Sequence, residues 1–302
     1  MTLSQTNVLL SFLNTEADGL SSVELQKLVF LYSKIIEKKP SYEFVPFQKG
    51  CYSFTLAHDM ESLVSKEYVE QTRDLSTHEH RFFLTDYGRF QIADARTTSL
   101  YISHFRKANP WHGNDLIAFT YRRFPYWATR SRILDQILGD SPPTREAIAQ
   151  ARPKSSVRLA SIGYEGRSVE NYFNALIQNR IDILYDVRRN PISRKFGFSK
   201  LALQRICSGL GITYIHLPIL GIDGSERTAL NTQADYDALF ARYEKMTLPR
   251  QDVISVIGAM ADTVRKGKHV ALTCFEANPL QCHRTRVIRK LEELLSINHS
   301  DL

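Results

Sequence analysis

The stretch ALTCFEANPLQCHRTRVIRK, residues 271–290, joins an apolar run to a basic helical pattern through a short polar loop. The run that ends at Cys274 predicts a buried strand, and the pattern that starts at Cys282 predicts an amphipathic helix. The joint carries a carboxylate, two thiols, an imidazole and a guanidinium, whereas a plain turn is usually built from Gly, Asn or Ser. This stretch therefore indicates a strand–loop–helix unit whose loop holds a site.

The same alternation extends over residues 158–302. Strands are predicted near 158–164, 182–187, 213–218 and 269–276, and helices near 169–180, 198–211, 234–246, 253–267 and 282–295. Strands that alternate with helices imply a parallel sheet, and strands that are apolar throughout are buried on both sides. We expect an α/β C-terminal domain, an open, mainly parallel sheet with helices on both faces.

Polar residues follow each of the four predicted strands. Ligands bind beyond the carboxyl ends of the strands in such a sheet, so these residues should meet at one rim. Guanidinium groups suit phosphate, which predicts a ligand-binding set of Tyr164, Arg167, Arg188, Arg189, Ser193, Arg194, His216 and Arg284. Acid–base or nucleophilic chemistry predicts a catalytic set of Glu165, Asp186, Glu276, Cys282 and His283. The expected ligand is anionic and nucleotide-like.

Several of these residues have a simpler interpretation. Asp186 can form a salt bridge with a neighbouring arginine, and Cys282 can cap the loop instead of acting as a nucleophile of lowered pKa. Zinc could be held by Cys274, Cys282, His283 or His216, but the two cysteines are further apart in sequence than in common zinc motifs. We therefore predict no metal ligands and leave the cofactor undefined.

Residues 1–95 predict a winged helix-turn-helix domain. Helical patterns cover the beginning of the chain, residues 21–36 and residues 53–70, and RFFLTDYGRF indicates a small β-ribbon with a turn at 85–88. The expected recognition segment contains Asp59, Glu61, Glu67 and Glu70 against the single Lys66. That surface is poor for phosphate, so contact with a protein partner is an alternative to DNA binding.

Residues 96–140 are rich in basic and aromatic side chains. Residues 96–158 carry 11 basic and 4 acidic side chains, a net charge of +7, against −4 for residues 1–95. A nucleic-acid surface is predicted at Arg106, Lys107, Arg122, Arg123, Arg130 and Arg132. The alternative is that the aromatic residues pack helices together and the basic residues are solvated. Residues 141–157 indicate a linker with one helical turn.

The totals restrict the class of protein. A length of 302 residues suggests two domains, and a hydrophobic content of 43% suits a globular protein. No apolar run reaches the ~20 residues of a membrane span. We expect no secretion signal at the N-terminus, and the four cysteines form no disulfide framework, which suggests reduced thiols and a cytoplasmic location.

Taken together, SIGYEG, DVRRNPISRKFGFSK, YIHLP followed by LG, and CFEANPLQCHR resemble the domain-of-unknown-function family 488 over residues 158–295. The N-terminal QKLVFLY and FVPFQKGCYSF are similar to winged-helix modules that accompany this family and certain toxin–antitoxin or phage-related proteins. The resemblance implies that Tyr164, Glu165, Asp186, Arg188, Arg189, Ser193, Arg194, His216, Glu276, Cys282, His283 and Arg284 are signature positions. It also implies nucleic-acid work in a defence or mobile-element context, without a defined reaction.

Two functions follow from these patterns. The first is an enzyme that acts on a nucleotide or nucleic acid, with DNA as the favoured polymer, through an arginine-rimmed crevice. The alternative is a DNA-binding regulator whose α/β domain senses an anionic small molecule.

Overall fold

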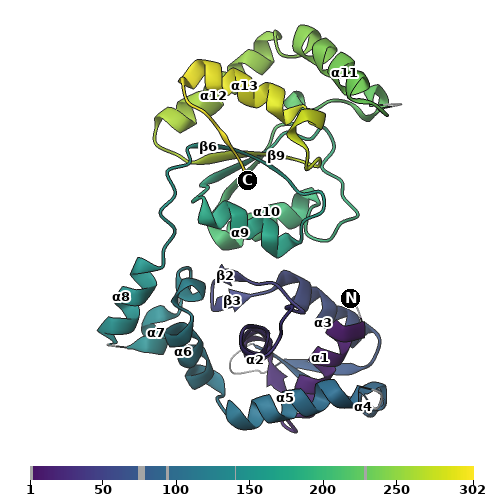
Figure 1. The fold of residues 1–302 in the computed structure, drawn as a ribbon, viewed down its shortest axis with the longest axis vertical. Coiled ribbons are helices and arrows are strands. Elements are labelled where there is room, and N and C mark those ends of the chain that lie inside the picture. Colours follow the sequence, from purple (N-terminus) through teal and green to yellow (C-terminus); the bar gives the residue numbers. More distant parts are fainter. Residues whose placement is uncertain (1–2, 74–78, 93–94, 140, 228–229) are drawn as a thin grey trace. The chain divides into compact units, whose positions relative to one another are not determined.

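A computed structural model describes residues 3–73, 79–92, 95–139, 141–227 and 230–302. The chain divides into two compact units, residues 1–152 and 153–302 (Figure 1). Each unit has its own apolar core, one built largely on α1 and α2 and the other on the strands and helices of the C-terminal part. Among the described residues, no helix combines the length and the apolar character that crossing a bilayer requires.

The first unit is mainly helical. Its helices are α1 (Leu3–Asn14), α2 (Ser22–Ile35), α3 (Phe54–Ser65), α4 (Asp86–Ile92), α5 (Arg96–Ala108), α6 (Gly113–Arg123), η1 (Pro125–Ala128), α7 (Leu134–Leu138) and α8 (Pro142–Gln150). Its strands are β1 (Leu20–Ser21), β2 (Val45–Phe47), β3 (Gly50–Tyr52), β4 (Val69–Arg73) and β5 (His80–Leu84). Helix α2 starts where a capping box forms, because the Ser21 hydroxyl accepts from the amide of Glu24 and the Glu24 carboxylate accepts from the amide of Ser21.

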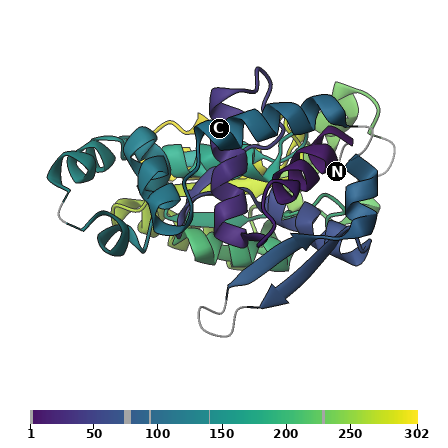
Figure 2. The same cartoon turned by 90° about the horizontal axis from the view of Figure 1, so that it is seen from below.

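The antiparallel strands of the first unit form a three-stranded sheet in the order β1–β5–β4. Figure 2 shows β4 and β5 as two arrows side by side. The helix expected over residues 53–70 is shorter than predicted: α3 ends at Ser65, and Val69 begins β4. The prediction of a turn at residues 85–88 is wrong, because α4 begins there. The hydroxyl of Thr85 caps this helix by accepting from the amide of Gly88.

The basic and aromatic segment belongs to the first unit. Phe105 and Tyr121 are buried, and Trp127 packs edge-on against Phe30 of α2 at 5.1 Å between ring centroids. These aromatic side chains therefore pack helices, as the simpler interpretation expected. The predicted linker contains the nine-residue helix α8, which is longer than the single turn expected there, and buried Ile148 fixes it to the unit.

The second unit is the predicted α/β domain. Its strands are β6 (Leu159–Gly163), β7 (Ile183–Asp186), β8 (Thr213–His216), β9 (Val270–Cys274) and β10 (Ser300–Asp301). Its helices are α9 (Val169–Gln178), α10 (Lys200–Leu210), η2 (Pro218–Leu220), η3 (Gly224–Glu226), α11 (Gln233–Met246), α12 (Gln251–Arg265), η4 (Pro279–Gln281) and α13 (Arg284–Leu295). All strand pairs are parallel, in the order β10–β6–β9–β7–β8.

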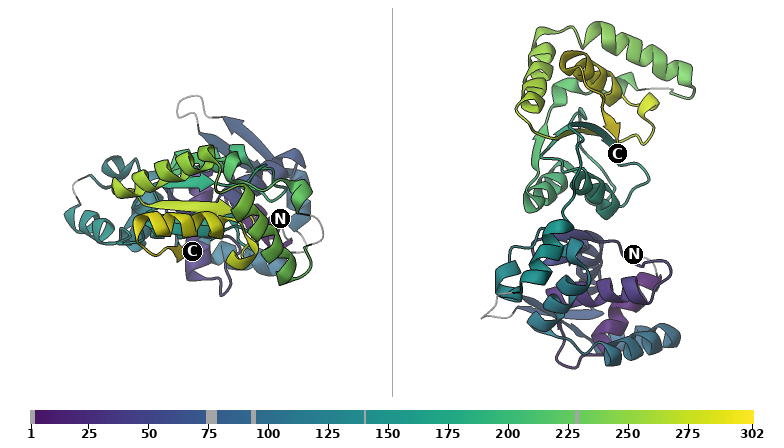
Figure 3. Two further views of the ribbon diagram at one scale, coloured as in Figure 1. Left: turned by 90° about the horizontal axis from the view of Figure 1, so that it is seen from above. Right: turned by 60° about the vertical axis from the view of Figure 1, so that its left-hand side comes forward.

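Helices cover both faces of this sheet, which confirms the predicted class (Figures 1 and 3). Helices α9 and α10 lie on one face, and α12 and α13 lie on the other. The central strands β6 and β9 are buried at every residue because each face is covered. In register, Gly163 lies opposite Cys274 and Asp186 lies opposite Thr273, so neighbouring strands end at the same level.

Candidate functional site

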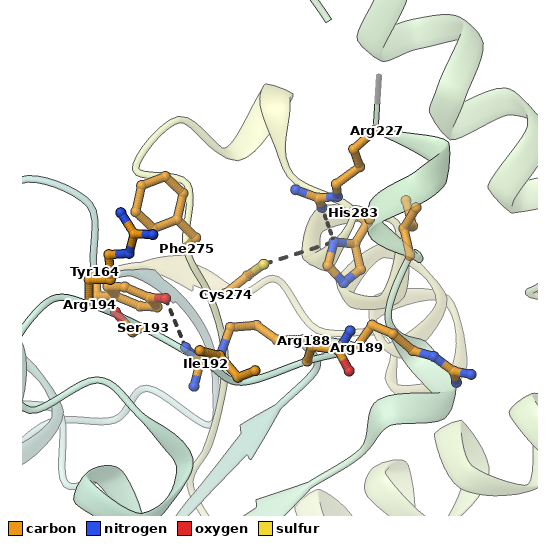
Figure 4. A pocket seen from close by; sticks show the side chains of 13 residues that line it. Tyr164, Arg188, Arg189, Ile192, Ser193, Arg194, Arg227, Cys274, Phe275 and His283 are labelled. Carbon is orange, nitrogen blue, oxygen red and sulfur yellow. Dashed lines mark hydrogen bonds between the residues drawn. The ribbon is translucent and has the colours of Figure 1, made fainter. Parts of the chain in front are cut away.

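A cavity of about 380 Å³ opens at the carboxyl ends of the strands in the second unit. The segments that follow β6, β7, β8 and β9 all contribute to its lining, as the parallel topology predicts. The lining consists of Tyr164, Arg188, Arg189, Asn190, Ile192, Ser193, Arg194, Ile222, Gly224, Arg227, Cys274, Phe275 and His283. Figure 4 shows the side chains of ten of these residues by name.

Three arginines reach this cavity with side chains that are not enclosed by protein. Arg189 and Arg194 are exposed, and Arg227 is half-buried. Exposed Phe275 adds an apolar wall, and Tyr164 adds a second aromatic group that stacks on Phe198 with 4.4 Å between ring centroids. The cavity thus combines positive charge with aromatic surface.

Asp186 lies beneath this lining and does not reach the cavity. Its carboxylate is fully buried and accepts from Arg188 at Nε (2.8 Å) and at Nη2 (2.5 Å). The phenol of Tyr214 donates to the same carboxylate at 2.7 Å. The remaining nitrogen of Arg188, Nη1, donates to the Tyr164 hydroxyl and to the carbonyl of Phe198. The ion pair of Asp186 with Arg188 therefore fixes the loop that carries Arg189 and Arg194.

Two further residues of the predicted site hold the loop after β9. The carboxylate of Glu165 accepts from the amide of Ala277 at 3.0 Å. Arg284 is buried and donates to the carbonyl of Glu276 at 2.5 Å and to the Ser161 hydroxyl at 3.0 Å. Neither side chain lines the cavity, so the geometry favours a positioning role for both.

The loop ends bring two cysteines and a histidine together. The sulfur atoms of Cys274 and Cys282 and a ring nitrogen of His283 lie within 4.8 Å of one another, and all three side chains are buried. Nε2 of His283 lies 3.0 Å from the carbonyl of Val187, and Arg227 donates to its Nδ1 at 2.9 Å (Figure 4). Since guanidinium can only donate, this contact requires Nδ1 to accept, which corresponds to the tautomer with the proton on Nε2.

Proton affinities in this group are strongly shifted. A hydrogen bond from Cys282 lowers the pKa of Cys274 to about 6 against the effect of burial, and neighbouring His283 adds to the shift. Burial raises the pKa of Cys282, and its bond to Cys274 raises it further. The two shifts have opposite directions, so ionisation of this pair is favoured at Cys274 over Cys282. The direction for Cys282 is opposite to the lowered pKa that the sequence suggested for a nucleophile there.

The pKa values of the neighbouring Glu276 and His283 are also shifted by contacts within this group. Burial opposes ionisation of Glu276, but Arg227 and the Cys282 thiol outweigh it and lower the pKa of Glu276 to about 2. Burial lowers the pKa of His283, but the Cys274 thiolate outweighs it and raises that pKa. The positive charge of Arg227 opposes this shift, because it disfavours a second positive charge on the imidazole.

Arg227 is the main residue that the sequence-based prediction missed. It forms an ion pair with Glu276, contacts His283 and lines the cavity. It lies 11 positions after His216, the last residue of β8, whereas His216 is the one residue of this part of the chain in the predicted sets. Applying the rule about strand ends to the whole segment would have included it. Phe275 was missed because a single exposed aromatic residue carries no pattern.

The remaining predicted ligand-binding residues lie in different places. Ser193 lines the cavity, and its hydroxyl accepts from the amide of Lys195. His216 contacts the carbonyl of Arg188 through Nε2 at 2.9 Å, and Arg167 donates to the carbonyl of Leu302. Neither His216 nor Arg167 lines the cavity.

The residues of the first unit that were predicted to bind nucleic acid differ in exposure. Arg106 is 7% exposed and forms an ion pair with Glu16 at 2.7 Å, so its guanidinium is occupied within the unit. Arg130 is half-buried. Four side chains are exposed: Lys107, Arg122, Arg123 and Arg132.

A family model described as "Domain of unknown function DUF488" matches residues 168–291. This range runs from the cap of α9 into α13 and includes most of the cavity lining, whereas Tyr164 lies just before it. No curated protein matches the chain. The match supports the resemblance in the C-terminal part, and the winged-helix part and the separate signature positions stay predictions.

Proposed function

We propose that the second unit is an enzyme that acts on a nucleotide, free or within a nucleic acid, in the arginine-lined cavity. The observation that carries this proposal is the meeting of three guanidinium groups with Cys274 and His283 in one cavity. Guanidinium binds phosphate in a bidentate manner, and an exposed aromatic face such as that of Phe275 stacks on a base. A volume of about 380 Å³ suits a ligand of this size.

The reacting groups of this proposal are those that reach the cavity. Cys274 and His283 line it, and Glu276 is joined to it through Arg227. Asp186 and Glu165 support the loops instead, so we assign them positioning roles. An anion sensor would need only the arginines, whereas the buried cysteine and imidazole add chemistry that binding does not require.

Binding of a mononucleotide should depend on the two exposed arginines. Replacing Arg189 and Arg194 together with alanine should weaken binding of ATP and other nucleoside triphosphates by at least about tenfold, because each charge-assisted hydrogen bond contributes about 1.5–3 kcal/mol. Calorimetric titration of the full chain measures this. Arg205→Ala is the matched control, since Arg205 is exposed on α10 and does not line the cavity.

Conversion of a nucleotide into a product distinguishes the proposed enzyme from the alternative, a ligand-sensing regulator. Mass spectrometry of each nucleotide after incubation should reveal a product with the wild-type chain and none with Cys274→Ser. Unchanged affinity in the double arginine variant would contradict the proposed binding site. Binding without any product, combined with a nucleotide-dependent DNA footprint, would establish the ligand-sensing regulator instead.

We also propose that the first unit is a winged helix-turn-helix domain. Its three helices α1, α2 and α3 followed by the β4–β5 ribbon, with β1 paired to β5, support this assignment, and the strands β2 and β3 form an extra hairpin between α2 and α3. The exposed side chains of α3 include His58, Glu61 and Ser65. This face lacks the positive charge that phosphate needs, so we propose that α3 contacts a protein partner and that the basic segment contacts DNA.

The exposed arginines at the end of α6 should contribute to DNA binding. Replacing Arg122 and Arg123 with alanine should weaken binding of a DNA duplex and reduce the salt slope by about 1 for each lost phosphate contact. Fluorescence anisotropy at several salt concentrations measures both quantities. The variant Lys38→Ala/Lys39→Ala removes the same charge from exposed positions elsewhere in the unit and should leave the slope unchanged. Equal slopes in both variants would contradict the assignment.

A further inference from the structure

We propose that Cys274, Cys282 and His283 bind a zinc ion with one coordination position open to the cavity. Thiolate sulfur and imidazole nitrogen are the ligands that zinc prefers, and three protein ligands with an open position are typical of catalytic zinc. The three ligand atoms come from the two ends of one loop. The zinc site adds a group that the proposed function does not specify.

Local structure explains why these residues converge. Cys274 is the last residue of β9, and Cys282 and His283 directly precede α13. Asn278 accepts from the amide of Leu280 to begin the turn η4, and the amide of Cys282 donates to the carbonyl of Pro279 to end it. This turn folds the chain back, so seven intervening residues separate two sulfur atoms that lie within 4.8 Å of each other.

The distances suit a tetrahedral ion. Zinc–sulfur bonds of about 2.3 Å and zinc–nitrogen bonds of about 2.0 Å place the ligand atoms of a tetrahedral site about 3.5–3.8 Å apart. Sγ of Cys274 lies 3.9 Å from Nδ1 of His283. A contraction of a few tenths of an ångström is therefore sufficient for this pair.

The orientation of the imidazole is set by its surroundings. Nε2 donates to the carbonyl of Val187, which leaves Nδ1 as the unprotonated nitrogen, 3.9 Å from Sγ of Cys274. Histidine ligands of metals usually donate their other ring nitrogen to a carbonyl or carboxylate in this way. The contact with Val187 thus selects the tautomer that a metal needs.

Charge balance also favours a divalent cation here. Two thiolates and one zinc ion form a neutral group, and the ion pair of Glu276 with Arg227 beside it is neutral as well. The hydrogen bond from Arg227 to Nδ1 of His283 must break before the ion can bind there. Arg227 can remain in place through its ion pair with Glu276. The other carboxylate oxygen of Glu276, Oε2, is buried without a hydrogen-bond partner among the described residues and can accept from a zinc-bound water.

The open position lies on the cavity side. Cys274 and His283 line the cavity, whereas Cys282 is fully buried behind them. A water on the ion would therefore face the space between the arginines, where the proposed nucleotide would bind. Zinc lowers the pKa of a bound water to about 7, which would supply a hydroxide for hydrolysis.

Metal content of the full chain tests the proposal directly. Protein purified under reducing conditions and dialysed against zinc should retain about one zinc ion per chain, measured by elemental analysis and native mass spectrometry. Cys274→Ser, Cys282→Ser and His283→Ala should each lower zinc affinity by at least about 100-fold, because each removes a ligand. Cys207→Ala is the matched control, since Cys207 is a buried thiol of the same unit outside the cluster.

Cobalt titration of the wild-type chain keeps the test decisive if a variant fails to fold. Cobalt bound by two thiolates and an imidazole should give intense sulfur-to-metal absorption and the visible bands of a tetrahedral ion. Zinc should protect Cys274 and Cys282 from alkylation, measured by peptide mapping. The absence of these bands, or full zinc content in Cys282→Ser, would overturn the zinc site. Nucleotide binding is measured separately, so failure of either proposal is distinguishable.

Discussion

Replacing Asp186 with alanine should lower the free energy of unfolding of the second unit by about 3–5 kcal/mol, because it leaves a buried guanidinium without its counter-ion. Asp186 is fully buried, and Arg188 is only 6% exposed. In the variant, Arg188 keeps the Tyr164 hydroxyl and the Phe198 carbonyl but loses both carboxylate oxygens. The loop that carries Arg189 and Arg194 should lose its fixed position as a result.

The two units can be followed separately in this experiment. Both tryptophans, Trp111 and Trp127, belong to the first unit, so tryptophan fluorescence reports on that unit alone. Far-ultraviolet circular dichroism reports on both, and the transition that has no counterpart in fluorescence belongs to the second unit. We expect only this transition to move to lower denaturant concentration in Asp186→Ala.

Two further variants make the result specific. Asp252→Ala removes an acidic residue from an exposed pair with Arg250 and should leave the midpoint unchanged. The double variant Asp186→Ala/Arg188→Met removes both charges and should regain part of the lost stability. If Asp186→Ala instead unfolds like the wild type and loses turnover, the positioning role is wrong and the catalytic role predicted from sequence is correct.

Replacing Gly163 with alanine should displace the loop after β9 and lower the free energy of unfolding by about 3 kcal/mol. A Cβ atom at this position would lie 1.9 Å from the carbonyl oxygen of Glu276 and 2.7 Å from its carbonyl carbon. These are backbone atoms, so no side-chain rotation relieves the clash. Arg284 holds the same carbonyl, and moving it would disturb the buried guanidinium as well.

Loss of the loop position should also affect the site. Glu276 lies two residues after Cys274, so displacement of its backbone should weaken both nucleotide and zinc binding in Gly163→Ala. Gly258→Ala is the matched control: Gly258 lies inside α12 with open space around its Cα, and alanine there should stabilise the helix by about 0.5–1 kcal/mol. Gly163→Ala with wild-type stability and unchanged binding would show that the loop adapts at little cost.

Local patterns predicted the elements of the second unit with few errors. The apolar runs of β6, β7, β8 and β9 and the helical spacing of α9 to α13 depend on residues close together in the sequence. The short edge strand β10 was not predicted, because two residues with polar side chains carry no strand pattern. The first two residues of β4, Val69 and Glu70, were assigned to a helix because alternation in KEYVEQ was too brief to stand out from the helical pattern before it.

The site was predicted only in part, for a similar reason. Position after a parallel strand was enough to predict that Arg189, Arg194 and His283 would meet, and all three line one cavity. The same rule could not separate them from Arg188 and Arg284, which are buried and act within the protein. Burial depends on what packs above a residue, and adjacent arginines have the same appearance in sequence.

The sequence by itself determined the order of strands and helices and the edge of the sheet at which the polar loops meet, because hydrophobic periodicity and parallel connections are properties of short segments. Only the tertiary structure decided which groups are paired and which face the cavity. The ion pair of Arg227 with Glu276 spans 49 positions, and the contact of His283 with Val187 spans 96. Charge and coordination at this site depend on such distant contacts, since proton affinity and ligand geometry follow from neighbours in space.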